Sequence, residues 1–397
     1  MPSRKSKDST VRREPLLDPP PKPVRRSRTQ SPGSGGRRLP TMQDIADASG
    51  VSQSTVSRVL TGAPNAIAIN PATRERILEL ARQMHYRPNP LARGLRGAKT
   101  MLLGVIVREI MDPFFSVAID AISNEANRHG YNVVLGNARG RTEQVIALRG
   151  VLETRHCDAI LLVGDTSDQP LLLEDLRDTD VSVVGLWQGS APILGISTVG
   201  VDNRAGINSA MDHLIELGHQ RIAVVGGAFV GGRLIGDTGE RRTAFLERAS
   251  VEGLANPDGY VRDASNTLGG GAGALRELME LPEPPTAIVA STDILAIGAM
   301  HEASRRGLHI PGDISIVGFD DLPMSEYTTP SLTTIHQPTA EMAVAGVSAA
   351  IAGQDDEVGR AATTLQILKP SLVIRESTGP QHVYAIRGAS GGAESLA

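Results

Sequence analysis

The 397-residue sequence contains a single cysteine, Cys157. One cysteine excludes a disulfide within the chain and any metal cluster held by several cysteines, and such usage is typical of a reducing compartment. We interpret Cys157 as a small buried apolar residue rather than a nucleophile. No apolar run approaches the roughly 18 residues of a membrane-spanning helix, so we expect no membrane partner. The basic N-terminus lacks the apolar segment of a secretory signal, which favours a cytoplasmic protein.

Sequence signatures of catalysis are also absent. The sequence has no Gly-x-Ser-x-Gly turn after a strand, no His-Glu-x-x-His, and no phosphate-binding loop with its lysine. The run GGGAGA at 269–274 does not follow a clear strand, and we interpret it as a flexible lead into a helix near Leu275–Met279. The nine histidines are scattered, and we interpret His85 as a surface or core residue rather than a ligand. The sequence therefore favours a binding protein over an enzyme and indicates no metal or other cofactor.

Charge is distributed unevenly along the chain, although the net charge is only −4. Residues 1–40 hold eleven Lys and Arg against three acidic residues, residues 41–100 hold eight against four, and residues 101–378 hold twenty against thirty-six. A basic front on an acidic body indicates that the front meets a polyanion while the body avoids it. Residues 1–40 are rich in Pro, Ser, Arg and Gly without periodicity, so we predict a disordered basic tail. For this tail alone, simple solvation is the alternative.

Helix signals begin at Thr41, an N-cap candidate with Asp44 three residues later. The first helix would stop at Gly50, and a third would start at Asn70, just before a proline that suits a first helical position. Two short helices joined by a tight glycine-containing turn form a helix-turn-helix, which we predict within residues 41–87. Six apolar residues would form its core: Ile45, Val51, Val56, Leu60, Ile77 and Leu80.

The stretch VSQSTVSRVL at 51–60 supplies the second helix. Its apolar residues form one narrow stripe, because Val59 and Leu60 follow Val56 at helical spacing, and Ser52 stands at the N-cap position. A helix of this size fits the DNA major groove, where base edges present distinct donors and acceptors. We interpret its polar face as a reader of base edges, for which an ordinary polar surface is the alternative. This face carries Gln53, Ser54, Ser57 and Arg58.

After Thr100 the sequence alternates between apolar strand candidates and helical stretches. In one helical stretch, apolar residues recur at helical spacing from Ile207 to Ile215. Such alternation is typical of parallel sheets covered by helices on both faces. At least seven strands indicate two doubly wound subdomains, whose ligands bind beyond the carboxyl ends of the strands. The strand candidates are 102–107, 132–137, 159–164, 181–187, 221–227, 287–291 and 314–320.

Long motifs, in order along residues 41–378, resemble the lac repressor family of bacterial transcription regulators. The first group is TMQDIADASGVSQSTVSRVLTG from Thr41, then TRERILEL, YRPNPLARGLRG, TMLLGVIV and DPFF at 112–115. The second group is VDNRAG at 201–206, HLIELGHQRIAVVGG, PPTAIVASTDILAIGA, GLHIPGDISIVGFDD at 307–321 and TTPSLTTIHQP ending at Pro338.

The resemblance implies a sequence-specific DNA-binding repressor, whose operator binding is controlled by a small effector such as a sugar or related metabolite. It implies a homodimer on a near-palindromic operator in double-stranded DNA, and a core like the periplasmic sugar-binding proteins. A regulator that is independent of an effector, or controlled by a protein, with a vestigial cleft, is the alternative. The expected divisions are a basic tail (1–40), a helix-turn-helix domain (41–87), a hinge helix (88–99), an effector-binding and dimerisation core (100–378) and a disordered C-terminal tail (379–397).

The resemblance also assigns DNA-contacting residues. Gln53, Ser54 and Arg58 would occupy base-reading positions, with Arg58 placed to pair with guanine. Leu95 matches a hinge leucine that wedges into the minor groove and unstacks one base step. The full set expected at DNA is Thr41, Ser52, Gln53, Ser54, Thr55, Ser57, Arg58, Asn89, Arg93 and Leu95.

In the core, the resemblance implies an effector cleft between the two subdomains. Trp187 would face two phenylalanines, Arg241 would clamp the ligand and Asp320 would accept hydrogen bonds, whereas core packing is the alternative for the aromatic residues. Leu186 falls where sugar-binding members often have Asp, and Thr292 where many have Asn. These departures weaken the expectation of a sugar and leave a less hydroxylated ligand open. The expected effector-binding residues are Phe114, Phe115, Trp187, Arg241, Thr292 and Asp320.

Overall fold

The computed structural model divides the chain into two compact units, residues 1–87 and 88–397. The residues it describes are 40–61, 69–86, 99–138, 157–166, 170–177, 181–189, 193, 195–230, 233–255, 257–354 and 363–381. The predicted basic tail up to residue 39 lies outside these ranges, as does most of the predicted hinge helix and of the C-terminal tail. The hinge residues outside them are Asn89, Arg93 and Leu95.

The first unit contains the three predicted helices, α1 (Met42–Ser49), α2 (Gln53–Thr61) and α3 (Pro71–Gln83). The residues from which we predicted the ends of these helices also stabilise those ends. Thr41 and Asp44 form a reciprocal capping box. Ser52 and Asn70 each accept a hydrogen bond from a backbone N–H of the helix that they precede. Gly50 ends α1 with a φ of 68°, a left-handed conformation that glycine adopts without steric cost.

A small apolar core holds the three helices together. Ile45, Val56 and Ile77 are completely buried at its centre. The other three predicted core residues, Val51, Leu60 and Leu80, are partly buried and pack against this centre. The predicted core is confirmed, and it fixes which face of α2 points away from the other helices.

The second unit contains two sheets, a hairpin and the helices around them. Its strands are β1 (Leu102–Val107), β2 (Asn132–Asn137), β3 (Ala159–Val163), β4 (Ser182–Leu186), β5 (Ser197–Val201), β6 (Ile222–Val225), β7 (Ala228–Val230), β8 (Arg233–Ile235), β9 (Val261–Arg262), β10 (Ala287–Ala290), β11 (Ser315–Asp320), β12 (Thr333–His336), β13 (Leu365–Leu368) and β14 (Ser371–Val373). Its helices are α5 (Pro113–Arg128), α7 (Pro170–Arg177), α8 (Asn203–Glu216), α9 (Gly236–Val251), α10 (Leu268–Met279), α11 (Asp293–Arg305) and α12 (Thr339–Ala352), with short 3-10 turns η1 (Pro257–Tyr260) and η2 (Pro323–Tyr327).

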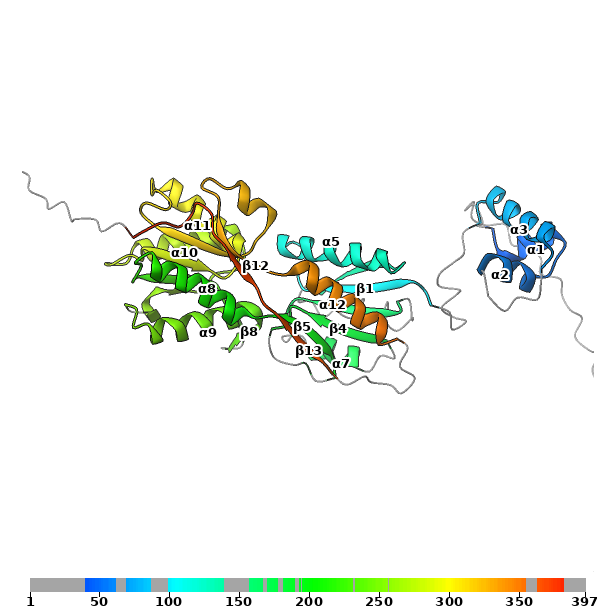
Figure 1. The fold of residues 1–397 in the computed structure, drawn as a ribbon, viewed down its shortest axis with the longest axis horizontal. Coiled ribbons are helices and arrows are strands. Elements are labelled where there is room, and N and C mark those ends of the chain that lie inside the picture. Colours follow the sequence, from blue (N-terminus) through cyan, green and yellow to red (C-terminus); the bar gives the residue numbers. More distant parts are fainter. Residues whose placement is uncertain are drawn as a thin grey trace, which may run out of the picture. The chain divides into compact units, whose positions relative to one another are not determined.

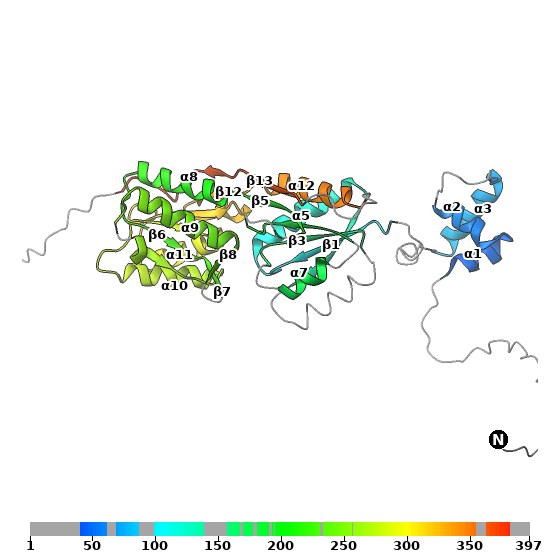
Figure 2. The same cartoon turned by 90° about the horizontal axis from the view of Figure 1, so that it is seen from below.

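Each sheet has six strands and defines one subdomain (Figures 1 and 2). The first has the order β13-β5-β4-β3-β1-β2 and is parallel throughout. The second has the order β14-β12-β11-β10-β6-β9, and only β14 runs antiparallel to its neighbour. All seven predicted strands are present. Of the strands missed, β9 and β14 have only two and three residues, but β5 is as long as the predicted β3 and β4, so length does not account for every miss.

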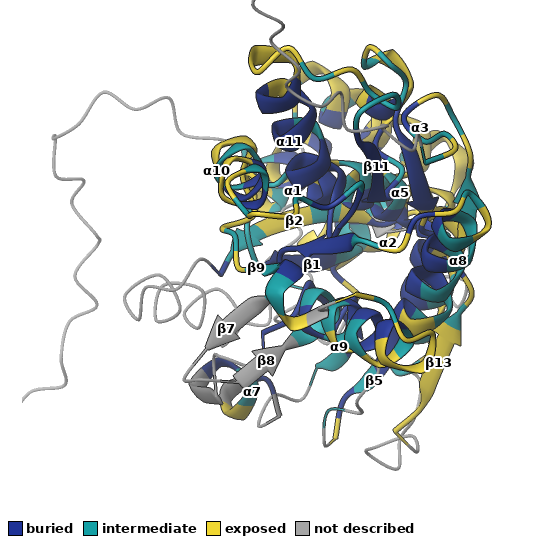
Figure 3. Ribbon diagram, turned by 90° about the vertical axis from the view of Figure 1, so that its left-hand side faces the viewer, coloured by how far each residue is buried: buried dark blue, intermediate teal, exposed yellow. Residues whose placement is uncertain are grey.

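Helices cover both faces of each sheet, which confirms two doubly wound subdomains. On the first sheet, α5 and α12 pack on one face and α7 on the other. On the second, α10 and α11 pack on one face and α8 and α9 on the other. Figure 3 shows β1 and β11 as buried strands inside this cover. The apolar face predicted from Ile207 is buried through Leu214, and Ile215 at its end is partly buried.

The chain crosses between the two sheets three times. It passes to the second sheet between β5 and α8, returns between β12 and α12, and crosses again between β13 and β14. The two subdomains are therefore each assembled from distant parts of the sequence, and Asn203 and Gln337 lie directly at the first two crossings.

The prediction of a flexible lead at 269–274 is wrong. These residues form the first turns of α10, which begins at Leu268 with Thr267 as its N-cap. The glycines allow α10 and α11 to approach closely, because a Cβ atom at Gly271 would overlap the carbonyl oxygen of Leu295. A Cβ at Gly298 would overlap α10 in the same way. Close helix packing, rather than flexibility, accounts for the run of glycines.

Packing continues past residue 378, where the core was predicted to end. Gly379 N donates to Ser315 Oγ at 3.2 Å, and Gln381 N donates to Leu217 O at 2.9 Å. The start of the predicted C-terminal tail is therefore held on the second subdomain. Within the described ranges, every helix is too short or too polar to cross a membrane.

We expect Gly271→Ala to lower the free energy of unfolding by about 1–3 kcal/mol, because the added methyl group meets the α11 backbone, which cannot rotate away. Gly273→Ala on the same helix is the control, since nothing lies within 4 Å of its added Cβ. Alanine should stabilise α10 there by up to about 1 kcal/mol. Urea unfolding measures both changes, and equal effects of the two substitutions would contradict the close packing.

Candidate functional site

The outer face of α2 is the candidate reading surface of the first unit. Gln53, Ser54 and Arg58 are exposed, while Val56 and Val59 are buried against the other helices. The short apolar stripe therefore anchors α2 by one side only. The remaining side presents an amide, a hydroxyl and a guanidinium group on a rigid helix, which are groups that can hydrogen bond to base edges.

The other residues expected at DNA in this unit have partners within it. Thr41 Oγ1 donates to Asp44 Oδ2 at 2.7 Å. Ser52 Oγ lies 2.8 Å from Ser54 Oγ and 2.9 Å from Thr55 Oγ1. These hydroxyls stabilise the first turns of α1 and α2. Ser57, two residues after Thr55, is half-buried. Their local bonds hold the reading surface in a fixed orientation.

A cleft of about 990 Å³ lies between the two subdomains of the second unit. Its walls include residues at the carboxyl ends of strands of both sheets, such as Arg108 directly after β1, Thr292 two residues after β10 and Gln337 directly after β12. Ligands of parallel sheets bind at this carboxyl edge. All six residues expected to bind an effector line the cleft: Phe114, Phe115, Trp187, Arg241, Thr292 and Asp320.

Aromatic rings form the apolar wall of the cleft. The Phe114 ring lies edge-on to Phe115, with centroids 5.5 Å apart, and to Trp187, with centroids 5.3 Å apart. All three side chains are nearly buried and belong to the apolar core of the first subdomain. Gly164 makes room for Phe115, since a Cβ there would lie 2.6 Å from the Phe115 ring. The aromatic residues therefore serve as core and as cleft wall at once.

Trp187 has an unusual backbone conformation at the end of β4. Its φ is 55°, which is rare for a bulky residue and is sustained only when neighbours fix it. Its N–H donates to Val199 O at 3.1 Å, and its indole Nε1 donates to Gln337 Oε1 at 3.1 Å. The ring is therefore held between a strand of the first sheet and the second crossing of the chain.

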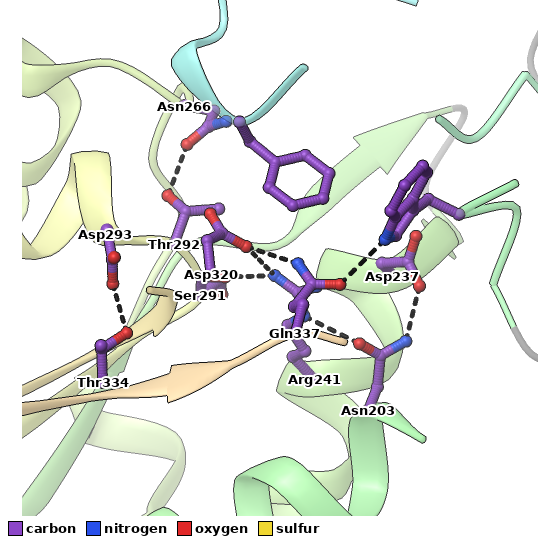
Figure 4. A network of polar contacts seen from close by, with 12 residues as sticks. Asn203, Asp237, Arg241, Asn266, Ser291, Thr292, Asp293, Asp320, Thr334 and Gln337 are labelled. Atoms are coloured by element: carbon purple, nitrogen blue, oxygen red, sulfur yellow. Dashed lines mark hydrogen bonds and ion pairs between the residues drawn. The ribbon is translucent and has the colours of Figure 1, made fainter. Parts of the chain in front are cut away.

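Arg241 is the centre of the polar wall (Figure 4). Although it is only 3% exposed, its Nε donates to Asn203 Oδ1 at 2.8 Å and its Nη1 to Ser291 O at 2.7 Å. Asp320 Oδ1 lies 3.4 Å from the same Nη1, and the guanidinium carbon lies 3.6 Å from the Phe319 ring centroid. The buried cation is thus compensated by a carboxylate, two oxygen acceptors and an aromatic face.

The polar network extends from Arg241 in two directions. Gln337 Nε2 donates to Asp320 Oδ1 at 2.7 Å, which connects Arg241 to the indole of Trp187. On the other side, Asn203 Nδ2 donates to Asp237 Oδ1 at 2.7 Å. Asn203, Asp237 and Gln337 were not singled out from the sequence. Two of them do lie in motifs of the family resemblance, Asn203 in VDNRAG and Gln337 in TTPSLTTIHQP. The motifs do not show, however, which side chain each residue bonds to.

Burial raises the pKa of Asp320 well above its usual value, although the Arg241 guanidinium opposes this shift. Asp320 also has a φ of 122°, at the end of β11. The loop that follows is fixed by Asp293, whose carboxylate accepts from Leu322 N at 2.8 Å and Ser325 Oγ at 2.6 Å. Burial raises the pKa of Asp293 to about 6. Of these two desolvated carboxyl groups, Asp320 lines the cleft, whereas Asp293 bonds to the loop that follows β11.

The expectation that Leu186 lies in the cleft is wrong. Its side chain is completely buried and packs on α12, where a Cβ at Gly346 would lie 2.6 Å from Leu186 Cδ2. Side chains alternate along a strand, so Leu186 points to the helical cover rather than to the carboxyl edge. A leucine at this position therefore removes no polar group from the cleft wall and says nothing about how hydroxylated the ligand is.

Cys157 is half-buried rather than fully buried, and lies next to Gly104 of β1. Burial raises the pKa of its thiol to about 11, with the Asp158 carboxylate acting in the same direction. A thiol of this kind is a poor nucleophile, as interpreted from the sequence. In the part of the chain that the structure describes, no three His, Cys, Asp or Glu side chains are grouped to hold a metal ion.

Two family descriptions match the chain, "Bacterial regulatory proteins, lacI family" over residues 41–89 and "Periplasmic binding protein-like domain" over residues 211–378. The HTH-type transcriptional repressor CytR of Escherichia coli (strain K12) is 32% identical over 339 residues, which are 85% of this chain and 96% of CytR. The chain belongs to the lacI family of bacterial regulatory proteins.

Solved structures agree with this assignment. The complex of the transcriptional regulator CelR with cellobiose is 26% identical, with a TM-score of 0.62, and covers 85% of this chain and 99% of CelR. A lac repressor dimer bound to operator and the anti-inducer ONPF, 24% identical with a TM-score of 0.73, has the same fold over 86% of this chain and 100% of its own. This lacI-family member is a transcription regulator with a helix-turn-helix domain and a periplasmic-binding-protein-like effector domain, as predicted from the sequence.

We expect Arg241→Ala to lower the free energy of unfolding by about 3–5 kcal/mol, because it leaves the buried Asp320 carboxylate without its cation. Arg204→Ala is the matched control, since Arg204 on α8 pairs with Glu247 at the surface, where an ion pair contributes little. Urea unfolding followed by the fluorescence of Trp187, the single tryptophan, measures both variants. Equal stability of the two variants would show that the Arg241 network does not support the fold.

Proposed function

We propose that this regulator is a repressor that binds a near-palindromic operator as a homodimer, with α2 in the major groove. The supporting observation is the exposed polar face of α2, which carries Gln53 and Ser54 in the first turn and Arg58 in the last turn. The lac repressor dimer on its operator supports this assembly. We assign the hydroxyl groups of the first two helices to phosphate contacts, which fix the register on DNA. These are Thr41, Ser52, Thr55 and Ser57.

We also propose that the hinge residues act at the minor groove. Leu95 would unstack a base step while Asn89 and Arg93 contact the DNA beside it. The relatives are named as regulators rather than enzymes, which supports a cytoplasmic protein that acts by binding and not by catalysis.

The cleft is proposed to bind a small hydroxylated effector, a sugar or related metabolite. Its aromatic wall offers an apolar face to the C–H groups of a ring. Among the described residues, Asp320 Oδ2 and Arg241 Nη2 make no hydrogen bond, so they are available to accept from and donate to hydroxyl groups. The volume of about 990 Å³ is at the upper end for small-molecule sites, which suits a disaccharide. Cellobiose in the CelR complex supports this class.

One observation favours the effector-independent alternative. Trp187, Gln337, Asp320 and Arg241 bond to one another, so the polar groups of the cleft wall satisfy one another in part. The same bonds would also help a ligand to bind, because a preformed site loses less freedom on binding. A ligand screen separates the two functions.

We expect Arg58→Ala to weaken binding to an operator selected in vitro by about 1–3 kcal/mol and to relax preference at one base pair. Random-sequence DNA should be bound with little change. Arg82→Ala is the control, because Arg82 is an exposed arginine on α3 of the same unit. It should affect both DNAs alike. If Arg58→Ala weakened both DNAs equally, Arg58 would contact only phosphate.

A thermal-shift screen of sugars and nucleosides on the whole protein tests the effector. We expect a hydroxylated compound to raise Tm and change operator affinity, and Asp320→Asn to weaken binding of that compound about tenfold, since an amide nitrogen cannot accept the hydrogen bond that Asp320 Oδ2 would accept. Asp321→Asn is the control, because Asp321 bonds to Arg375 and His336 and does not line the cleft. If operator binding persists and no compound shifts Tm, the effector-independent alternative holds.

A further inference from the structure

A chain of hydrogen bonds crosses the cleft between the two subdomains. Asn266, in the turn before α10, donates from Nδ2 to Asp112 Oδ2 at 2.8 Å, and Asp112 precedes α5 of the first subdomain. Asn266 Oδ1 accepts from Thr292 Oγ1 at 2.6 Å, a pair that is visible in Figure 4. The three side chains therefore tie together parts of the molecule that the backbone joins only through its crossings.

Both ends of this chain are helix caps. Asp112 Oδ1 accepts from Phe114 N at 3.0 Å at the start of α5, and Thr292 Oγ1 accepts from Leu295 N at 3.4 Å at the start of α11. The first turns of these helices also share apolar contacts, because Ile294 belongs to the same buried cluster as Phe114. The hydrogen bonds of Asn266 thus lie beside an apolar contact between the two subdomains, that of Ile294 with the cluster of Phe114.

The chemistry fixes how Asn266 is oriented. A carboxylate only accepts hydrogen bonds, so the amide nitrogen of Asn266 faces Asp112 and its oxygen is left for the Thr292 hydroxyl. Burial raises the pKa of Asp112, while the Phe114 N–H and the Arg241 guanidinium oppose this shift. Asp112 is half-buried and Asn266 is exposed, so the donor from Asn266 takes the place of a water molecule at Asp112 Oδ2, and the net gain is that of one solvent-accessible hydrogen bond.

We propose that Asp112, Asn266 and Thr292 form a closure latch, with Asn266 as its positioning residue. The latch favours the closed arrangement of the two subdomains in the ligand-free protein and adds to the free-energy difference that an effector has to shift. The latch itself depends only on the core, whereas its link to an effector rests on the proposed function. The influence of the cleft on DNA binding can be no larger than that difference in free energy.

Distances between spin labels test the latch in the whole protein. We place labels on cysteines introduced at the exposed Asn127 of α5 and Ser304 of α11, in a Cys157→Ser background. Labelled chains are mixed with excess unlabelled chains, so that each dimer carries one labelled copy. We expect Asn266→Ala to raise the ratio of open to closed molecules by roughly 2- to 10-fold, the range of one hydrogen bond. Asn266→Asp should open the cleft further, because two carboxylates would then face each other.

A double substitution separates the latch from general damage. Asp112→Ser keeps an oxygen that caps α5 but removes the acceptor of Asn266. Asp112→Ser with Asn266→Ala should open the cleft no more than either substitution alone, since both remove one bond. Asn124→Ala is the control, because it removes a similar bond, to Asp120 Oδ2 at 3.0 Å, that stays within α5.

Unchanged distances in Asn266→Ala, or opening that adds up in the double variant, would overturn the latch. An effect of Asn124→Ala as large as that of Asn266→Ala would overturn it as well. The effector screen is a separate measurement on the unsubstituted protein. The latch and the proposed effector function can therefore fail independently.

Discussion

The arrangement of the cleft depends on one buried charge, the guanidinium group of Arg241. A cation removed from water is stabilised when a carboxylate lies close to it and oxygen acceptors bind its N–H groups. Asn203, Ser291 and Asp320 satisfy this requirement, and the Phe319 ring covers one face of the group. Asn203 and Asp320 make further bonds, to Asp237 and Gln337, so the polar wall is one connected network around the cation.

The same network lies where the chain passes between subdomains. Asn203 follows the first crossing and Gln337 precedes the return, and both bond within one or two steps of Arg241. A change at the cleft therefore acts on side chains that sit at two of the three crossings. This is a physical route by which occupancy of the cleft could alter the angle between subdomains, since packed elements shift as units rather than deform.

The main helices and strands could be predicted from the sequence because they depend on residues that are close together in the chain. Helical spacing at Ile207 and caps at Thr41 and Asn70 depend on neighbours in the chain, and all three are found in the structure. The glycine run at 269–274 was misinterpreted because its partner, α11, is distant in sequence. Local signals indicate flexibility for such a run, and only the facing helix shows why the glycines are needed.

The site was only partly accessible from the sequence. The resemblance placed six residues that do line the cleft, but the bonds between them join residues far apart, such as Trp187 with Gln337 and Asn266 with Asp112. The prediction for Leu186 was wrong for a related reason, since the direction of its side chain depends on the pleat of β4 and on the position of α12. Which side chains bond to each other across a cleft depends on how the two sheets are placed. Such pairs therefore produce no periodic pattern in the sequence.

The internal bonds of the cleft also define how selective it can be. Among the described residues, Asp320 Oδ2 and Arg241 Nη2 have hydrogen-bonding capacity that a ligand can match, whereas a ligand that takes their bonded partners has to break bonds that already exist. Breaking them would leave buried polar atoms unpaired, which is more costly than a missing contact at a surface. Selectivity in such a site arises less from the number of contacts offered than from the rejection of ligands that cannot restore the bonds they displace.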